Sequence, residues 1–190
     1  MKSRGSAADV LAQGDIQGGV ALVMRDLGPR VYGLLMSLLR NREETAEEAF
    51  SLFAENLCRY AATYRGEGSL EAWVYTLARN AAVTVTRDGW RMRGRRLATR
   101  ESEKLAEDVR TRSALRRERQ ANVLDELRAT LDLDEQILLA LRLDEALSWE
   151  DVARVMSGDG PAVDAQVVRK RFERLKGRLG DEARRLGYLG

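Results

Sequence analysis

The chain has 190 residues, of which 33% are charged and 44% hydrophobic, and its 32 basic and 30 acidic side chains leave a formal net charge of +2. The absence of histidine and the single cysteine exclude histidine-based catalytic triads, imidazole metal sites, four-thiolate zinc sites and internal disulfides. No apolar run exceeds five residues, far short of the roughly 20 that a membrane-spanning helix needs, and the first residues contain no apolar stretch typical of a secretory signal. We therefore expect a cytoplasmic chain without membrane insertion.

The low proline content, and the predominance of Ala, Leu and Val among the apolar residues, predict an all-α chain made of two small helical domains. Residues 1–19 show little periodicity, so we expect a flexible N-terminal arm. Residues 20–96 are predicted to form the first domain, with one helix divided at Gly28-Pro29. The next helix carries an apolar stripe from Ala46 to Tyr64, and Ser69 can cap the helix that follows.

Residues 97–122 alternate basic and acidic side chains and contain few large apolar residues, which predicts a flexible charged linker, helical at most transiently. Residues 123–190 are predicted to form the second domain. There a short helix that begins at Ser148 is followed by the turn residues 157–161 and by a basic amphipathic helix with Phe172 on its apolar side. This succession is typical of a helix-turn-helix, which places its second helix in the major groove of DNA.

Charge is segregated along the chain although the total is nearly neutral. Residues 42–55 carry five acidic and one basic side chain, residues 79–100 carry seven arginines and one aspartate, and residues 166–185 carry eight basic and three acidic side chains. Two basic segments and one acidic segment favour a protein that contacts a polyanion twice and a basic partner once. Solvated helix faces would produce the same charge runs, so composition alone leaves both interpretations open.

Three segments carry a resemblance to a known family. Residues 64–80 read Y-R-G-E-G-S-L-E-A-W-V-Y-T-L-A-R-N and closely resemble the second domain of extracytoplasmic-function (ECF) sigma factors, where the usual pattern is an aromatic, R-G-E-x-S-L, two residues, W-L-Y, two residues and A-R-N. Residues 147–153, L-S-W-E-D-V-A, are similar to the family's L-S-Y-E-E-I-A, and residues 168–176, V-R-K-R-F-E-R-L-K, to its V-K-S-R-L-H-R-A-R. The resemblance covers both predicted domains in the family's order, from about residue 26 to residue 179.

The resemblance implies a transcription initiation factor that is not an enzyme and needs no cofactor. Its partners would be core RNA polymerase and promoter DNA, and the family suggests an anti-sigma factor as a further partner. The resemblance places the polymerase contacts on Glu47, Glu48, Ser51 and Glu55 of the acidic helix.

The resemblance also implies two DNA-binding sites. Contacts to the minus-ten promoter element would come from Tyr64, Arg65, Gly66, Ser69, Arg79, Asn80, Arg87 and Arg91, and contacts to the minus-thirty-five element from Gln166, Arg169, Lys170, Arg171 and Arg174. Asn80 has the donor and acceptor that reading a base edge requires, whereas the arginines suit phosphates. Trp73 lies on an apolar stripe and is expected mainly in the core, and for Tyr75 a core role and a DNA role are both open.

Two features depart from the family pattern. Phe50-Ser51-Leu52 stands where the family usually has V-Q-E, which changes a polar polymerase-contacting feature, and residues 157–164 make a longer turn than usual. The first departure keeps an alternative open, a helix-turn-helix DNA-binding transcription regulator that does not join RNA polymerase. An enzyme acting on nucleic acid is disfavoured, because no compact acidic cluster with metal-ligand spacing accompanies the basic segments.

Overall fold

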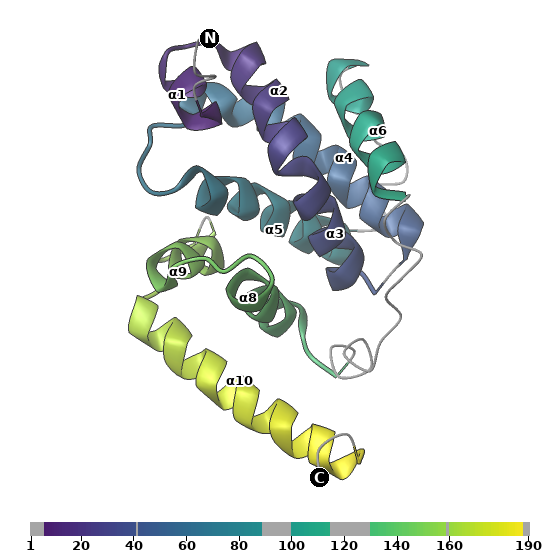
Figure 1. The fold of residues 1–190 in the computed structure, drawn as a ribbon, viewed down its shortest axis with the longest axis vertical. Helices are drawn as coiled ribbons and strands as arrows, with labels where there is room; N and C mark the ends of the chain where they lie inside the picture. Colours follow the sequence, from purple (N-terminus) through teal and green to yellow (C-terminus); the bar gives the residue numbers. More distant parts are fainter. Residues whose placement is uncertain (1–5, 41, 89–99, 115–129, 159, 188–190) are drawn as a thin grey trace. The chain divides into compact units, whose positions relative to one another are not determined.

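The computed structural model describes residues 6–40, 42–88, 100–114, 130–158 and 160–187. Every regular element within these ranges is a helix (Figure 1), which confirms the all-α prediction for the described part of the chain. The chain divides into two compact units, residues 1–119 and residues 120–190. Among the described helices, none combines the length and the apolar character that crossing a bilayer requires.

The first unit begins with three helices, α1 (Ala7–Ala12), α2 (Ile16–Asp26) and α3 (Gly28–Leu38). Helix α1 lies in the segment that we expected to be a flexible arm. Ser6 and Asp9 form a reciprocal capping box that starts this helix. Leu11 is buried against Gly19 of α2, where an added Cβ atom would lie 2.4 Å from the Leu11 side chain. One leucine packed on one glycine gives no sequence periodicity, which explains why the pattern did not reveal the helix.

Helices α4 (Glu43–Tyr60) and α5 (Leu70–Asp88), joined through the short 3₁₀ helix η1 (Ala61–Thr63), complete the core of the first unit. The largest buried side chains are aromatic: the Phe50 ring lies 5.1 Å from the Tyr32 ring, edge to face, and 5.6 Å from the Phe53 ring. Phe50 therefore belongs to the core. Of the three residues that replace the family's V-Q-E, only Ser51 and Leu52 are partly accessible at the surface, and both are half-buried.

Helix α6 (Arg100–Ala114) lies within the segment predicted as a linker and packs against α3 and α4 of the first unit (Figure 1). Its buried residues are small: Ser102, Ala106 and Val109. Val109 sits over Gly28, where an added Cβ atom would lie 2.9 Å from the Val109 Cγ2 atom. Close approach between small residues holds this helix, and that kind of contact has no large-apolar signature in the sequence.

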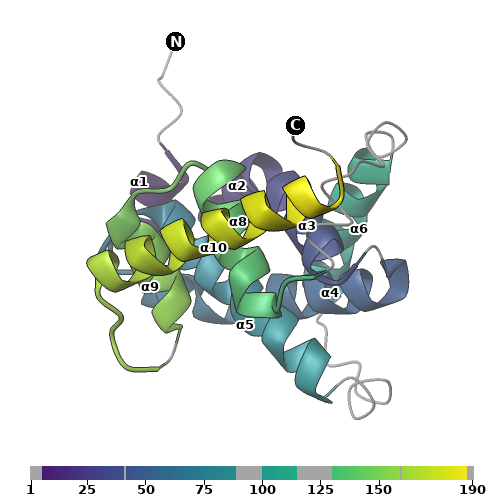
Figure 2. The same ribbon diagram turned by 90° about the horizontal axis from the view of Figure 1, so that it is seen from below.

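The second unit contains α8 (Leu133–Leu143), α9 (Trp149–Ser157) and α10 (Ala165–Arg185). Helix α10 is long and straight and packs on both α8 and α9 (Figure 2). Phe172 is buried, as predicted, and its ring meets the Trp149 ring edge to face at 5.4 Å. The guanidinium of Arg142 lies 4.7 Å from the centre of the same tryptophan ring, so a cation–π contact from α8 continues the stack.

Candidate nucleic-acid interface

The loop before α5 owes its shape to two glycines and one serine. Gly66 and Gly68 have φ values of 72° and 101°, in the left-handed region that favours glycine. The Ser69 hydroxyl accepts a hydrogen bond of 3.1 Å from the Ala72 backbone N–H and so caps α5. Of the loop residues that we assigned to DNA, Arg65 and Gly66 are exposed, whereas the hydroxyl of Ser69 is engaged in the cap.

An aromatic pair joins this loop to α5. The rings of Tyr64 and Trp73 lie 5.3 Å apart, and both side chains are half-buried. Trp73 therefore lies at the boundary of the core and not inside it. Tyr75 is fully buried and belongs to the core. Burial raises the pKa of the Tyr64 phenol, and the nearby Glu71 carboxylate raises it further. A tyrosine phenol is protonated at neutral pH, and this rise in its pKa moves it further from ionisation, so Tyr64 keeps its hydroxyl donor.

One face of α5 points away from the core and carries several of the predicted residues. Trp73, Thr76, Asn80, Val83 and Arg87 follow one another at intervals of three and four residues, and all are half-buried or exposed. This face therefore runs from the Tyr64–Trp73 pair toward the end of the described helix.

The outward face differs in detail from the set that the sequence suggested. Thr76 and Val83 were missed, although counting four residues back and three residues forward from Asn80 finds them. Arg79 lies about 100° around the helix from Asn80 and is half-buried, so the two point in different directions. Arg91 and the other basic residues of 89–99 lie outside the described residues.

The acidic helix α4 is more enclosed than its sequence suggested. It packs against α3, α5 and α6, and every residue from Thr45 to Cys58 is buried or half-buried. Glu47, Glu48 and Ser51 are half-buried, while the Glu55 side chain is only 12% exposed and forms an ion pair with Arg59. The exposed acids of α4 are Glu43 and Glu44 in its first turn, which the sequence analysis counted only in the acidic segment.

All five residues assigned to the second DNA site are exposed on α10. The side chains concerned are Gln166, Arg169, Lys170, Arg171 and Arg174. Gln166, Lys170 and Arg174 succeed one another at four-residue spacing and so share one face, opposite the buried Val168, Phe172 and Leu175. Asp164 caps the helix by accepting a 2.7 Å hydrogen bond from the Gln166 N–H, which places Gln166 in the first turn and Lys170 in the second.

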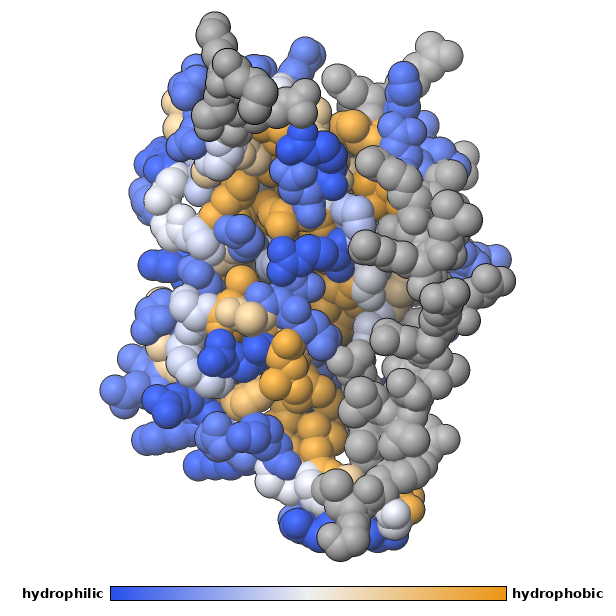
Figure 3. Space-filling view, in the orientation of Figure 1, coloured by the Kyte–Doolittle hydropathy of each residue, from blue (hydrophilic) through white to orange (hydrophobic). Residues whose placement is uncertain are grey.

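Ion pairs divide α10 into two halves. In the second half every described basic side chain is paired: Lys176 with Glu173, Arg178 with Glu135, Arg184 with Asp181 and Arg185 with Glu182. In the first half none of the four basic side chains, Arg169, Lys170, Arg171 and Arg174, pairs with an acid of the described residues. Hydrophilic side chains line this helix in Figure 3. The first half of α10 thus offers uncompensated positive charge to a polyanion.

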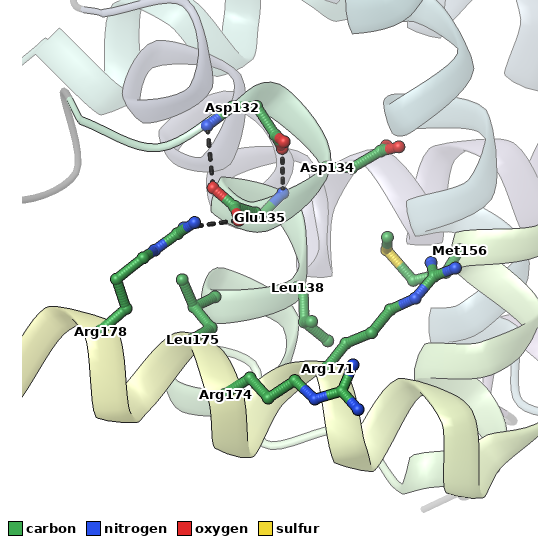
Figure 4. Close-up of a pocket in the computed structure, with 9 residues that line it drawn as sticks. All are labelled: Asp132, Asp134, Glu135, Leu138, Met156, Arg171, Arg174, Leu175 and Arg178. Atoms are coloured by element: carbon green, nitrogen blue, oxygen red, sulfur yellow. Dashed lines mark hydrogen bonds and ion pairs between the residues drawn. The ribbon is translucent and has the colours of Figure 1, made fainter.

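A hollow of about 420 Å³ between α8, α9 and α10 shows how α10 is held (Figure 4). Leu138 and Leu175 line it, and Arg178 closes one end by bonding to Glu135. Glu135 also accepts a 3.2 Å hydrogen bond from the Asp132 N–H and so completes the capping box of α8. Arg178, which lies on the same basic helix as the predicted DNA contacts, therefore ties α10 to α8.

Comparison with known families adds one finding. Residues 23–92 match the family model of sigma-70 region 2. The matched range contains the aromatic pair, the outward face of α5 and the acidic residues of α4. No curated protein matches the chain.

Proposed function

Since the chain belongs to the sigma-70 family, we propose that it is an alternative sigma factor of the ECF type, which directs core RNA polymerase to its promoters. Sigma-70 region 2 gives the chain a role in RNA polymerase binding and promoter melting. The observation that carries the finer proposal is the coincidence of this region with the Tyr64–Trp73 pair and the polar face of α5. That face combines aromatic rings, an amide side chain and an arginine, which are the groups that bind the bases and phosphates of single-stranded DNA.

In the proposed mechanism, the first unit captures the minus-ten element as the duplex opens. An unpaired base can stack on the exposed part of the Tyr64–Trp73 pair, whose rings lie 5.3 Å apart. Asn80, seven residues beyond Trp73 on the same face, offers a donor and an acceptor to a base edge. Arg87 continues the face and can bind a phosphate. Stacking and hydrogen bonding stabilise the base only when it is unpaired, so they shift the equilibrium of the duplex toward opening.

The second unit is proposed to read the minus-thirty-five element as a helix-turn-helix formed by α9 and α10. Side chains in the first turns of a recognition helix reach base edges, and Gln166 and Lys170 hold those positions. Arg171 and Arg174 are exposed, carry no described ion pair and suit phosphates. Arg169 lies about 100° from Lys170 around the helix and is better placed to contact the flanking backbone.

The acidic helix α4 is proposed as the contact to core polymerase, through Glu47, Glu48, Ser51 and Glu55. Charge complementarity across such a contact contributes to association rate and specificity more than to affinity. The exposed Glu43 and Glu44 extend the same acidic surface. Linking this contact to two DNA contacts raises their effective concentration, so none of the three needs high affinity alone.

The experiment that tests the proposal is transcription in vitro with core RNA polymerase and a library of genomic DNA fragments. We expect start sites that depend on adding the chain and that share two conserved elements upstream. Asn80→Ala should bind polymerase normally but open these promoters poorly. Sequence-specific DNA binding without any chain-dependent transcript would instead support the regulator that does not join polymerase.

A further inference from the structure

An exposed valine stands among the polar residues at the start of α10. Val167 is the third residue of this helix, and 43% of its surface is exposed, whereas the adjacent Val168 is buried. The other large apolar side chains exposed in the described part of the chain are Tyr60, Leu143 and Leu186, none of which lies in the first turns of α10. Val167 is therefore an isolated apolar group on a polar, basic surface.

Val167 lies on the same side of α10 as three of the basic side chains that form no ion pair with an acid of the described residues. Lys170 and Arg171 follow it by three and four residues, and Arg174 by seven, so all four side chains share one side of the helix. Its immediate neighbour Gln166 is exposed as well. A β-branched residue is a poor choice for stabilising an exposed helix turn, because it loses side-chain freedom there. Helix stability therefore does not account for a valine at this position.

A single apolar group in such a setting fits one feature of DNA. The 5-methyl group of thymine is the apolar group that the major groove displays, and small apolar side chains recognise it. A protein partner would need a contiguous apolar patch, which one valine surrounded by charges does not provide. We propose that Val167 is a specificity-determining residue that contacts a thymine methyl group in the minus-thirty-five element. The proposal rests on the proposed function and adds a base preference to it.

The test uses the holoenzyme formed by the full chain and core RNA polymerase. A library of DNA duplexes randomised over the minus-thirty-five element is first used to select the sequence that the holoenzyme binds and retains. Each thymidine of that sequence is then replaced in turn by deoxyuridine, which lacks only the 5-methyl group. We expect one replacement to weaken binding of the wild-type holoenzyme about fourfold, the loss that follows from one methyl group no longer being buried.

Two variants make the test specific to this side chain. In Val167→Ala the same replacement should weaken binding clearly less than in the wild type, because the two γ-methyl groups that would contact the thymine methyl are gone and only the Cβ atom is left. In Leu186→Ala it should weaken binding as in the wild type, since Leu186 is equally exposed, at 45%, but lies at the opposite end of α10. Alanine is the best helix former, so Val167→Ala should fold normally.

The outcomes separate this inference from the proposed function. Three outcomes would overturn the role of Val167: an equal loss of binding in the wild type and in Val167→Ala, no loss of binding at any thymidine, or a selected element without thymine. Each of these would leave the proposed sigma factor function intact. A holoenzyme that retains no upstream sequence at all would remove the proposed role of the second unit, and the inference with it.

Discussion

Replacing Gly28 with alanine tests whether α6 is seated on the first unit. The added Cβ atom would lie 2.9 Å from the Val109 Cγ2 atom, closer than real Cβ contacts, and Val109 is buried with a stiff, branched side chain. Overpacking of this kind costs about 1–3 kcal/mol. Because Gly28 has a helical backbone, alanine also stabilises by about 0.4–1 kcal/mol through the unfolded chain. The mid-range values of the two effects leave a net loss of about 1.3 kcal/mol, concentrated in α6.

The assay is hydrogen exchange of the α6 backbone amides, read by mass spectrometry. A loss of about 1.4 kcal/mol makes the amides of α6 exchange about tenfold faster. Gly33→Ala is the matched control, since Gly33 lies on the same helix with no atom within 4 Å of the added Cβ. It should leave the exchange of α6 unchanged.

A double-mutant cycle shows whether Val109 is the cause. With Val109→Ala the nearest atom of residue 109 to the new Cβ at residue 28 would be its own Cβ at 3.9 Å, an ordinary contact. Gly28→Ala should then be neutral or stabilising, which amounts to a coupling of about 1–3 kcal/mol between the two positions. If Gly28→Ala in the otherwise wild-type chain left α6 exchange as slow as Gly33→Ala does, the packing of α6 on α3 would be refuted.

Three further substitutions test the proposed sites. Asn80→Ala should lower open-complex formation about tenfold with unchanged polymerase affinity, as measured by permanganate reactivity of promoter thymines; equal reactivity would remove Asn80 from the site. Arg174→Ala should reduce the slope of log affinity against log salt concentration by about one, whereas the ion-paired Lys176→Ala should change it less, and equal changes would contradict the division of α10 into two halves. Ser157→Ala removes the acceptor of a 2.9 Å hydrogen bond from the Val163 N–H and should lower the free energy of unfolding by about 1–2 kcal/mol in urea; no change would show that this bond does not hold the turn.

The parts of the fold that sequence predicted are those with large apolar residues at helical spacing. The stripe around Phe50 and Phe53 places α4, and Ser69 marks the start of α5, because burial and capping leave a pattern in the residue types. Helices α1 and α6 left no such pattern. They are held by close approaches at Gly19 and Gly28, and a glycine in the sequence does not reveal which side chain will fill the space above it.

The candidate sites show the same limit. Exposure of the residues on α10 followed from the amphipathic pattern, since the buried stripe at Phe172 fixes the opposite face. Which of the basic residues are uncompensated depended on tertiary partners: Arg178 reaches Glu135, which is distant in sequence. The enclosure of α4 likewise depended on α6. Sequence therefore predicts which face a residue occupies but not which distant partner it meets.

The central claim is that the chain is a sigma factor, and its most direct test is association with core RNA polymerase in the absence of DNA. Purified full chain and core polymerase would be mixed at moderate salt and separated on a sizing column. The account predicts stoichiometric co-elution, for the wild type and equally for Asn80→Ala, whose defect lies in DNA opening. A chain that is folded by circular dichroism yet elutes apart from the polymerase would contradict the account, and Ser51 and Leu52, in place of the family's usual polar pair, would be the first residues to examine.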